Sequence, residues 1–369
     1  MTTTENSLTY PYDEPPPFGT TREIAPGVRW LQMPLPMSLK YINLYLIEED
    51  DGWVIVDTGI RGEETRDLWT KVIDNELGGK PVSRVICTHM HPDHTGQTGF
   101  LYELCQVPLY MSYSEYYQAK TMNNMMREGG SWQMSEYFLR AGIEQSFLEE
   151  LRDMRSSFAP DAEDLPLPSS FIRLSDGDTL TLGKHDWHIV TGTGHSPEHV
   201  CLYCPALKLF ISGDQILPVI TSNVSVHPTE PFANPMVGWL ESHEKLIELL
   251  PDDLLVLPAH NLPFYGIHER LQQLIDHHED RMLILEENCI EPRIAVDLLP
   301  YLFARKLEDF TRIMALGECI AHLHCLITRN RIERILDGNV YRYKSIDPTL
   351  SERARPGQHE KPDDAPGMV

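Results

Sequence analysis

His89-Met90-His91-Pro92-Asp93-His94 places four potential metal-ligand side chains within six residues, directly after the apolar run 82–87. In an extended segment, side chains two residues apart point to the same side, so the first two histidines can bind one ion. The chain then turns at the proline, and the aspartate and the third histidine can face a second ion. Two ions about 3.5–4 Å apart can share one hydroxide. The stretch therefore predicts a site for two metals.

Three later segments can complete this site, because each carries a ligand-type residue where a strand-like apolar run ends in a loop of small residues. They are Thr191-Gly192-Thr193-Gly194-His195, Ile211-Ser212-Gly213-Asp214 and Leu257-Pro258-Ala259-His260. The alternative is a collection of unrelated loop histidines in a chain that has 16 of them. A complete ordered set of ligands favours the metal site, since it is not expected by chance.

The ordered pattern HxHxDH, then His, Asp and His, resembles the metallo-β-lactamase superfamily over roughly residues 22–282. The resemblance implies that a first metal is held by His89, His91 and His195, that a second is held by Asp93, His94 and His260, and that Asp214 bridges both. Two divalent ions are therefore the expected cofactors. Zinc is the default, and Fe or Mn are alternatives for a carboxylate-bridged pair. Such a pair would turn a bridging water into a nucleophilic hydroxide at neutral pH.

Two further residues are candidates for supporting the ligands. In the family, the residue at Asp57 orients a ligand imidazole, and the alternative is that it caps the following helix. His199 resembles the second histidine of the family's GHTPGH segment and is expected to be structural or to orient a ligand. Glu198 replaces the usual glycine there, which puts the shape of this loop in question. The histidines outside the motif are explained by surface or helix positions: His227, His243, His268, His277 and His278.

The expected fold class is α+β, an αββα four-layer metallo-β-lactamase sandwich with a helical lid insertion and a small C-terminal winged-helix-like domain. Apolar runs that alternate or continue as strands do lie between turn-forming residues in both halves of the chain. We expect a disordered tail over 1–20, the sandwich domain over 21–285, the insertion over 110–168, the winged-helix-like domain over 286–346 and a second disordered tail over 347–369.

The insertion is rich in aromatic residues and methionine, and glycines at 129–130 and 142 should divide it into helices. Its place between two ligand segments would let it overhang the metals. Such adaptable apolar surface suits the tail of a substrate. The candidate substrate-binding residues are Tyr113, Tyr117, Met122, Met126, Trp132 and Tyr137. The alternative is that they form the insertion's own core or a contact within a homodimer, and both roles can hold together.

The C-terminal segment has helical spacing up to Thr328, followed by a predicted hairpin over 332–343 with an Asp-Gly turn. Helices followed by such a hairpin resemble the winged-helix appendix of some metallo-β-lactamase domains. The candidate recognition helix, 313–328, carries His322 and His324 but little positive charge. Packing or dimerisation is therefore favoured over DNA binding.

Composition excludes several classes of protein. The formal net charge of −24 disfavours nucleic-acid partners, which need a basic footprint. No stretch approaches the length of a membrane span, and the N-terminus lacks the features of a secretion signal. Seven scattered cysteines indicate buried thiols in a reducing compartment, and Cys201 and Cys204 lie in a predicted strand that points them to opposite faces. We therefore expect a cytoplasmic protein.

Function follows as metal-assisted hydrolysis of an ester or thioester bond, with Asp93 and Asp214 as candidate catalytic residues. No GxSxG motif is present, which agrees with activated water as the nucleophile. A small-molecule acyl substrate with an apolar tail, of the acyl-CoA type, is expected. The alternatives are a lactone hydrolase, disfavoured by Leu217 where lactonases of this family carry tyrosine, and a metal-dependent endoribonuclease. A flavodiiron-like reductase and a non-catalytic binding module are further alternatives.

Overall fold

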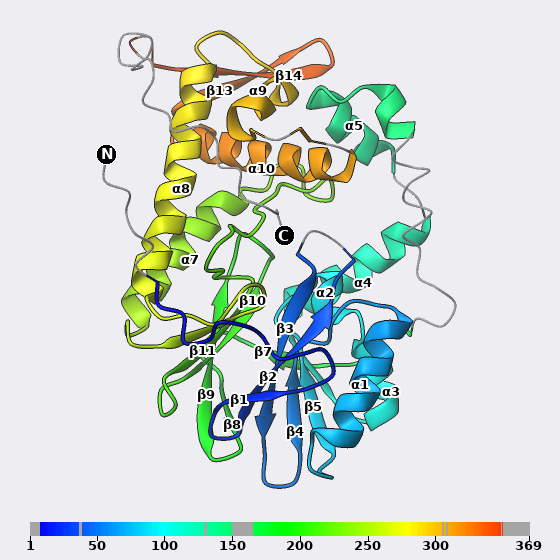
Figure 1. Cartoon of the computed structure of the whole chain (residues 1–369). Helices are drawn as coiled ribbons and strands as arrows, with labels where there is room; N and C mark the ends of the chain where they lie inside the picture. Colours follow the sequence, from blue (N-terminus) through cyan, green and yellow to red (C-terminus); the bar gives the residue numbers. More distant parts are fainter. Residues whose placement is uncertain are drawn as a thin grey trace.

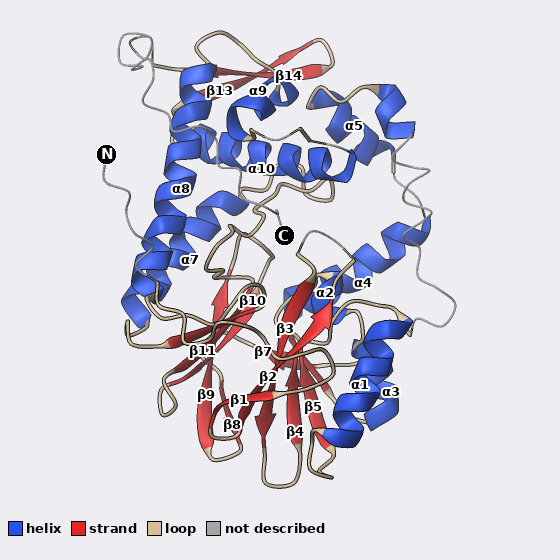
Figure 2. Ribbon diagram, in the orientation of Figure 1, coloured by secondary structure: helices blue, strands red, loops and turns tan. Residues whose placement is uncertain are grey.

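The computed structural model describes residues 8–36, 39–128, 131–149, 165–304, 306–307, 309–347 and 349. Two β-sheets pack face to face, with helices on their outer sides, and a helical layer with a two-stranded hairpin lies beyond one end of the sandwich (Figures 1 and 2). Among the described residues, no helix combines the length and the apolar content that crossing a membrane requires.

The first sheet has seven strands in chain order. They are β1 (Arg22–Ala25), β2 (Val28–Pro34), β3 (Tyr41–Glu48), β4 (Trp53–Val56), β5 (Val82–Ile86), β6 (Leu109–Ser112) and β7 (Ile172–Leu174). The first four strands form an antiparallel meander, and β4 to β7 run parallel. The helices α1 (Glu63–Asn75), α2 (Pro92–Thr95) and α3 (Thr98–Cys105) connect the parallel strands. The C-terminal ends of these strands therefore meet at one edge.

The second sheet has five strands in the order β12-β11-β10-β9-β8. Their bounds are β8 (Thr179–Leu182), β9 (His185–Gly192), β10 (His199–Cys204), β11 (Leu209–Gly213) and β12 (Leu255–Pro258). The outer helices are α7 (Pro235–Leu249) and α8 (Ile267–Asn288). Only β11 and β12 pair in parallel, and the helix α7 lies on the connection between them.

Three buried clusters define the four layers. One cluster lies between the sheets and includes Trp30, Tyr45 and Trp187; the other two lie between each sheet and its helices. Strand β3 shows the pattern, since Tyr45 faces the opposite sheet while Leu44 and Leu46 face the helical side. Because both faces of such a strand are covered, its sequence is almost continuously apolar. The predicted αββα sandwich is confirmed.

The insertion forms α4 (Tyr113–Glu128) and α5 (Trp132–Arg140), which end near the predicted glycines. Its first three predicted residues, 110–112, belong instead to β6. The helix α5 leaves the sandwich and packs against the C-terminal layer, where Phe138 lies in the same buried cluster as Leu316. The insertion thus connects the sandwich to the C-terminal layer (Figure 1).

The C-terminal layer contains α9 (Ala295–Leu302), α10 (Asp309–Thr328), β13 (Ile332–Asp337) and β14 (Val340–Ser345). The predicted hairpin is confirmed, with Gly338 at φ 59° in its two-residue loop. Buried residues of α10 such as Leu316, Ile320 and Leu323 place this helix in the core of the layer. The winged-helix resemblance stays a prediction.

The predicted N-terminal tail needs a correction. Residues 8–20 are packed on the sandwich, because Leu8 is buried beside the second sheet and Thr9 pairs with Tyr265. Tyr12 contacts the ring of Trp30 at 5.6 Å between centroids. These two apolar contacts and one backbone bridge hold a polar, proline-containing segment that composition alone assigned to disorder. Residues 1–7 and nearly all of 347–369 lie outside the described residues.

Candidate metal centre

The ligand loops lie at one edge of the sandwich, where strands of both sheets end. The first loop follows β5, and His91 is the N-cap of the short helix α2, which carries Asp93 and His94. The other loops follow β9, β11 and β12 and bring in His195, Asp214 and His260. The three later ligands come from the second sheet, so the site forms only when the two sheets pack together.

The seven candidate ligands gather into two adjoining groups. Within each group the ligand atoms lie within 4.8 Å of one another: His89, His91, His195 and Asp214 in the first, and Asp93, His94 and His260 in the second. In the first group, His89 Nε2 lies 2.8 Å from His91 Nδ1 and 3.2 Å from His195 Nε2. These nitrogens therefore point at a common centre.

Asp214 faces both groups, one oxygen to each. Its Oδ2 lies 3.4 Å from His195 Nε2 and 3.8 Å from His89 Nε2. Its Oδ1 lies 3.5 Å from the Nε2 atoms of both His94 and His260. This is the arrangement of a carboxylate that bridges two cations.

The donors fit a pair of divalent ions. Both carboxylate oxygens of Asp214 and the Nε2 atoms of His94 and His260 are buried and have no hydrogen-bond partner. Unpaired buried polar atoms are costly, so their convergence on one space indicates a cation that satisfies them together. Imidazoles and carboxylates without thiolate suit zinc, iron or manganese.

The charges around the second ligand group also favour a bound cation. Burial would lower the pKa of His94, but the carboxylates of Asp57, Asp214 and Asp93 hold it well above its usual value. Burial would raise the pKa of Asp214, but the imidazoles of His260 and His94 hold it well below its usual value. This corner of the site therefore favours a positive charge among ionised carboxylates, which a divalent ion supplies.

The second nitrogen of each buried imidazole is fixed by an outer partner, as metal-ligating histidines require. Asp57 Oδ2 lies 2.8 Å from His94 Nδ1, whereas the N-cap of α1 is Gly62, so the alternative role of Asp57 as a cap is wrong. The carbonyls of Asn223 and Tyr41 accept hydrogen bonds from His195 Nδ1 at 2.8 Å and from His260 Nδ1 at 3.2 Å.

His199 supports the site without facing either group. Its Nε2 accepts a hydrogen bond from the backbone N–H of Asp214 at 3.1 Å, and its ring stacks on His89 at 4.6 Å. The glutamate that replaces the family's glycine has a clear local role. Glu198 Oε2 accepts from the N–H of Ser114 at 3.0 Å, which joins this loop to the start of α4.

Two supporting residues were missed by sequence reasoning because they belong to no motif. Glu115, fully buried, accepts hydrogen bonds from the N–H groups of Met90 at 2.9 Å and Glu198 at 2.7 Å. It therefore joins the loops that carry the ligands of the first group. Its signal in the sequence is weak, since it is one acidic residue in the first turn of the helix that follows β6.

Asn43 is the second missed residue. Its side-chain N–H group donates to the carbonyl of Pro258 at 2.9 Å and to that of Asn261 at 2.6 Å, on either side of the ligand His260. Its carbonyl oxygen accepts from Trp30 at 2.9 Å. The sequence signal for Asn43 is a polar residue between apolar neighbours in a strand. Such a residue is buried with its neighbours and needs hydrogen-bond partners inside the protein.

The predicted substrate-binding residues do not form one lining beside the ligands. Tyr113 and Tyr117 are half exposed and pair at 4.7 Å, about opposite Glu115 on α4 by helical spacing. Met122 packs against the sandwich core, and Trp132 is 71% exposed. Tyr137 is buried and donates to the carbonyl of Val226. The side chain of Met126 lies outside the described residues.

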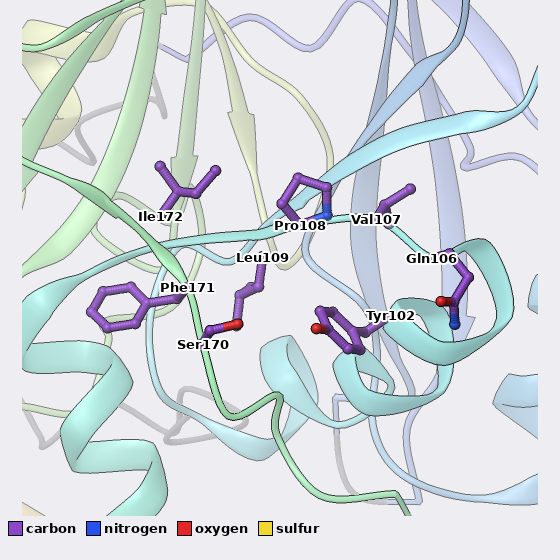
Figure 3. A pocket seen from close by; sticks show the side chains of 8 residues that line it. All are labelled: Tyr102, Gln106, Val107, Pro108, Leu109, Ser170, Phe171 and Ile172. Carbon is purple, nitrogen blue, oxygen red and sulfur yellow. The ribbon is translucent and has the colours of Figure 1, made fainter.

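Figure 3 shows a surface pocket of about 390 Å³. It is lined by Tyr102, Gln106, Val107, Pro108, Leu109, Ser170, Phe171 and Ile172. These residues lie where β6 and β7 begin, whereas the ligand loop follows the opposite end of the neighbouring β5. The pocket therefore does not belong to the metal centre.

A family model of the metallo-beta-lactamase superfamily matches residues 38–260, more than half of the chain. The chain belongs to this superfamily. The resemblance inferred from the HxHxDH pattern is thereby confirmed. A second model, the metallo-beta-lactamase-like C-terminal domain, matches residues 283–346.

The proteins to which this chain is similar carry names that describe different chemistries. A crystal structure of a beta-lactamase domain protein from Burkholderia ambifaria is 39% identical, with a TM-score of 0.83 over 92% of this chain and 98% of that one. A linear primary-alkylsulfatase from Pseudomonas sp. is 24% identical over 66% of this chain and 46% of the alkylsulfatase. The acyl-coenzyme A thioesterase MBLAC2 from Homo sapiens is 22% identical over 65% of this chain and 80% of the thioesterase.

Proposed function

We propose that this metallo-beta-lactamase superfamily hydrolase cleaves an acyl bond, a thioester or an ester of the acyl-CoA type, with two divalent ions. The observation that carries the proposal is the position of Asp214, whose two oxygens face the two ligand groups. The similarity to an acyl-coenzyme A thioesterase supports the choice of an acyl bond. When bound, two such ions acidify water to a pKa near roughly 7 and polarise a carbonyl oxygen.

The exposure of the ligands sets the side from which a substrate reaches them. His89, His94 and Asp214 are fully buried, whereas His91 and Asp93 are partly exposed. An acyl carbonyl therefore approaches over His91 and Asp93, one residue from each group. The reacting bond then lies over both ligand groups. One group can bind the attacking water while the other stabilises the leaving group.

Asp93 is the residue best placed to move a proton. Its Oδ2 faces the Nε2 atoms of His94 at 3.6 Å and His260 at 3.5 Å, which leaves Oδ1 to exchange a proton with water or with a leaving thiol. Burial would raise the pKa of Asp93, but these imidazoles lower it to about 2. The carboxylate is therefore ionised at neutral pH and can accept a proton.

The buried polar partners keep the ligands in place during the reaction. Asp57 holds His94, the Asn223 carbonyl holds His195, and His199 holds the backbone of Asp214. Such fixed groups do not need to reorganise as charge develops on the substrate. The acidic chain, with its net charge of −24, argues against the endoribonuclease alternative.

The proposal is tested with zinc-loaded protein on a panel of acyl-CoAs of graded length, nitrophenyl esters, lactones, primary alkyl sulfates and RNA. Release of free thiol from the acyl-CoAs is the expected main activity. Asp93→Asn should lower kcat about 100-fold or more with the fold intact, and the exposed Glu103→Gln serves as the matched control. Turnover of alkyl sulfates or RNA, with every acyl substrate inert, would contradict the proposal.

A further inference from the structure

A second group of buried metal-ligand side chains lies between helices α8 and α10. His278 of α8 and Glu318 and His322 of α10 offer ligand atoms that lie within 4.8 Å of one another. Both histidines are fully buried, and Glu318 is 5% exposed. None of the three belongs to the seven ligands of the sandwich. Figure 1 shows α8 and α10 crossing in the C-terminal layer.

The two imidazoles meet as those of the sandwich ligands do. His278 Nδ1 lies 3.0 Å from His322 Nε2, within the range of the 2.8 and 3.2 Å between the nitrogens of the first ligand group. His322 Nδ1 donates to the backbone carbonyl of Glu318 at 2.8 Å, so its Nε2 carries the lone pair. A backbone carbonyl on the second nitrogen is the usual outer partner of a metal-ligating histidine.

The third donor is a carboxylate held by a neutral partner. Glu318 Oε2 accepts a hydrogen bond from the Asn223 side chain at 3.0 Å, and Oε1 is the oxygen available to a cation. His278 Nε2 is buried without a hydrogen-bond partner. The group thus combines imidazole nitrogens and a carboxylate, the donor types of a transition-metal site, in a buried space between the two helices.

We propose that His278, Glu318 and His322 bind one divalent transition-metal ion of the zinc type, in a site separate from the sandwich centre. Two imidazoles and one carboxylate are suitable ligands for Zn²⁺, and also for Fe²⁺ or Mn²⁺. Three protein ligands leave a fourth position for water. The ion fastens α10 to α8, because its ligands come from both helices.

The site is also connected to the sandwich centre through one residue. Asn223 donates its side-chain N–H to Glu318, and its backbone carbonyl accepts from the ligand His195. The Ser225 hydroxyl donates a hydrogen bond to the side-chain oxygen Oδ1 of Asn223 at 2.6 Å. An ion on Glu318 therefore fixes the loop that orients His195, so the C-terminal layer contributes to the order of the sandwich site.

Metal analysis of the full-length protein, saturated with Zn²⁺ and dialysed, tests the proposal without relying on activity. Three ions per chain are expected in the wild type, and two in His322→Ala and in the isosteric Glu318→Gln. His243→Ala is the control, because this buried histidine of α7 lies outside the group; it should keep three ions. Two ions in the wild type, with no loss in the folded His322→Ala variant, would overturn the proposal.

A second measurement isolates the new site. In the triple variant His89→Ala, His94→Ala, Asp214→Ala, which lacks ligands of both groups of the sandwich centre, Co²⁺ should still bind and give the visible absorption of one coordinated ion. Adding His322→Ala should abolish that band, whereas adding His243→Ala should leave it. A band that persists unchanged with His322→Ala would contradict the site. The absorption band does not depend on whether these proteins hydrolyse acyl substrates. The proposed metal site and the proposed acyl hydrolase activity can therefore be disproved independently.

Discussion

One carboxylate oxygen of Glu115 accepts a hydrogen bond from the backbone N–H of Met90, the residue between the ligands His89 and His91. The other oxygen of Glu115 accepts one from the N–H of Glu198, so a single side chain of α4 keeps two ligand loops at a fixed separation. The insertion therefore reaches the metal centre through its first turn, by hydrogen bonds to the backbone and not by an aromatic surface.

Replacing this carboxylate should weaken metal binding. We expect Glu115→Gln to lower zinc affinity about 10-fold, since an amide offers one acceptor where two N–H groups need acceptors; outer partners of ligands typically contribute 10–100-fold. Competition with a chromophoric chelator measures the affinity. Glu103→Gln, on the exposed side of α3, is the matched control and should bind zinc as the wild type does. Equal affinities in both variants would show that Glu115 does not position the loops.

Asp57 contacts the second ligand group directly, through His94, and the first group only through Thr88. Asp57→Asn removes the carboxylate partner of His94 Nδ1, so the affinity for one of the two sandwich ions should fall by about 10–100-fold while the other changes little. Stepwise zinc titration resolves the two events. The exposed Asp67→Asn in α1 controls for the change of charge, and a loss of both ions together would argue against a group-specific role.

Asn43 should matter for stability as well as for the site. Asn43→Ala removes the acceptor of the buried side-chain N–H groups of Trp30 and Gln32, and each unsatisfied buried group costs about 1–3 kcal/mol. We expect the free energy of unfolding to fall by roughly 3 kcal/mol in urea titrations. Asn75→Ala, at an exposed helix position, should change it by less than about 0.5 kcal/mol.

His243 predicts a pH dependence of stability. Burial lowers its pKa to about 4, below the usual value near 6.5, so the neutral ring stabilises the fold above pH 6.5 and this contribution is lost as pH falls toward 4. On going from pH 8 to pH 4.5, the free energy of unfolding of the wild type should therefore fall by roughly 2 kcal/mol more than that of His243→Gln. Urea titrations at both pH values measure it, with the pH 8 difference as the internal reference. Parallel curves for the two proteins would contradict the prediction.

Much of the fold could be predicted because its signals are local. Strand β3, residues 41–48, is almost continuously apolar since both of its faces are covered, and such apolar runs between turn-forming residues are what predicted the sheets. Helix α4 ends at Glu128, just before the glycines expected to end it, and α5 ends just before Gly142, whose φ of 97° is incompatible with a helix. The tail over residues 8–20 was predicted wrongly, since a few well-placed apolar contacts outweigh a polar composition.

The sequence by itself determined the ligand types and their order, because His89 and His91 need only the extended backbone of their own segment to point the same way. Tertiary structure alone decided what Glu115, Asn43 and Glu318 do. A buried polar side chain takes its role from the backbone groups and imidazoles that folding brings next to it, and here these come from distant segments. It also decided that Tyr113 and Tyr137 lie in different surroundings, since helix orientation and packing assign each aromatic ring to solvent or core.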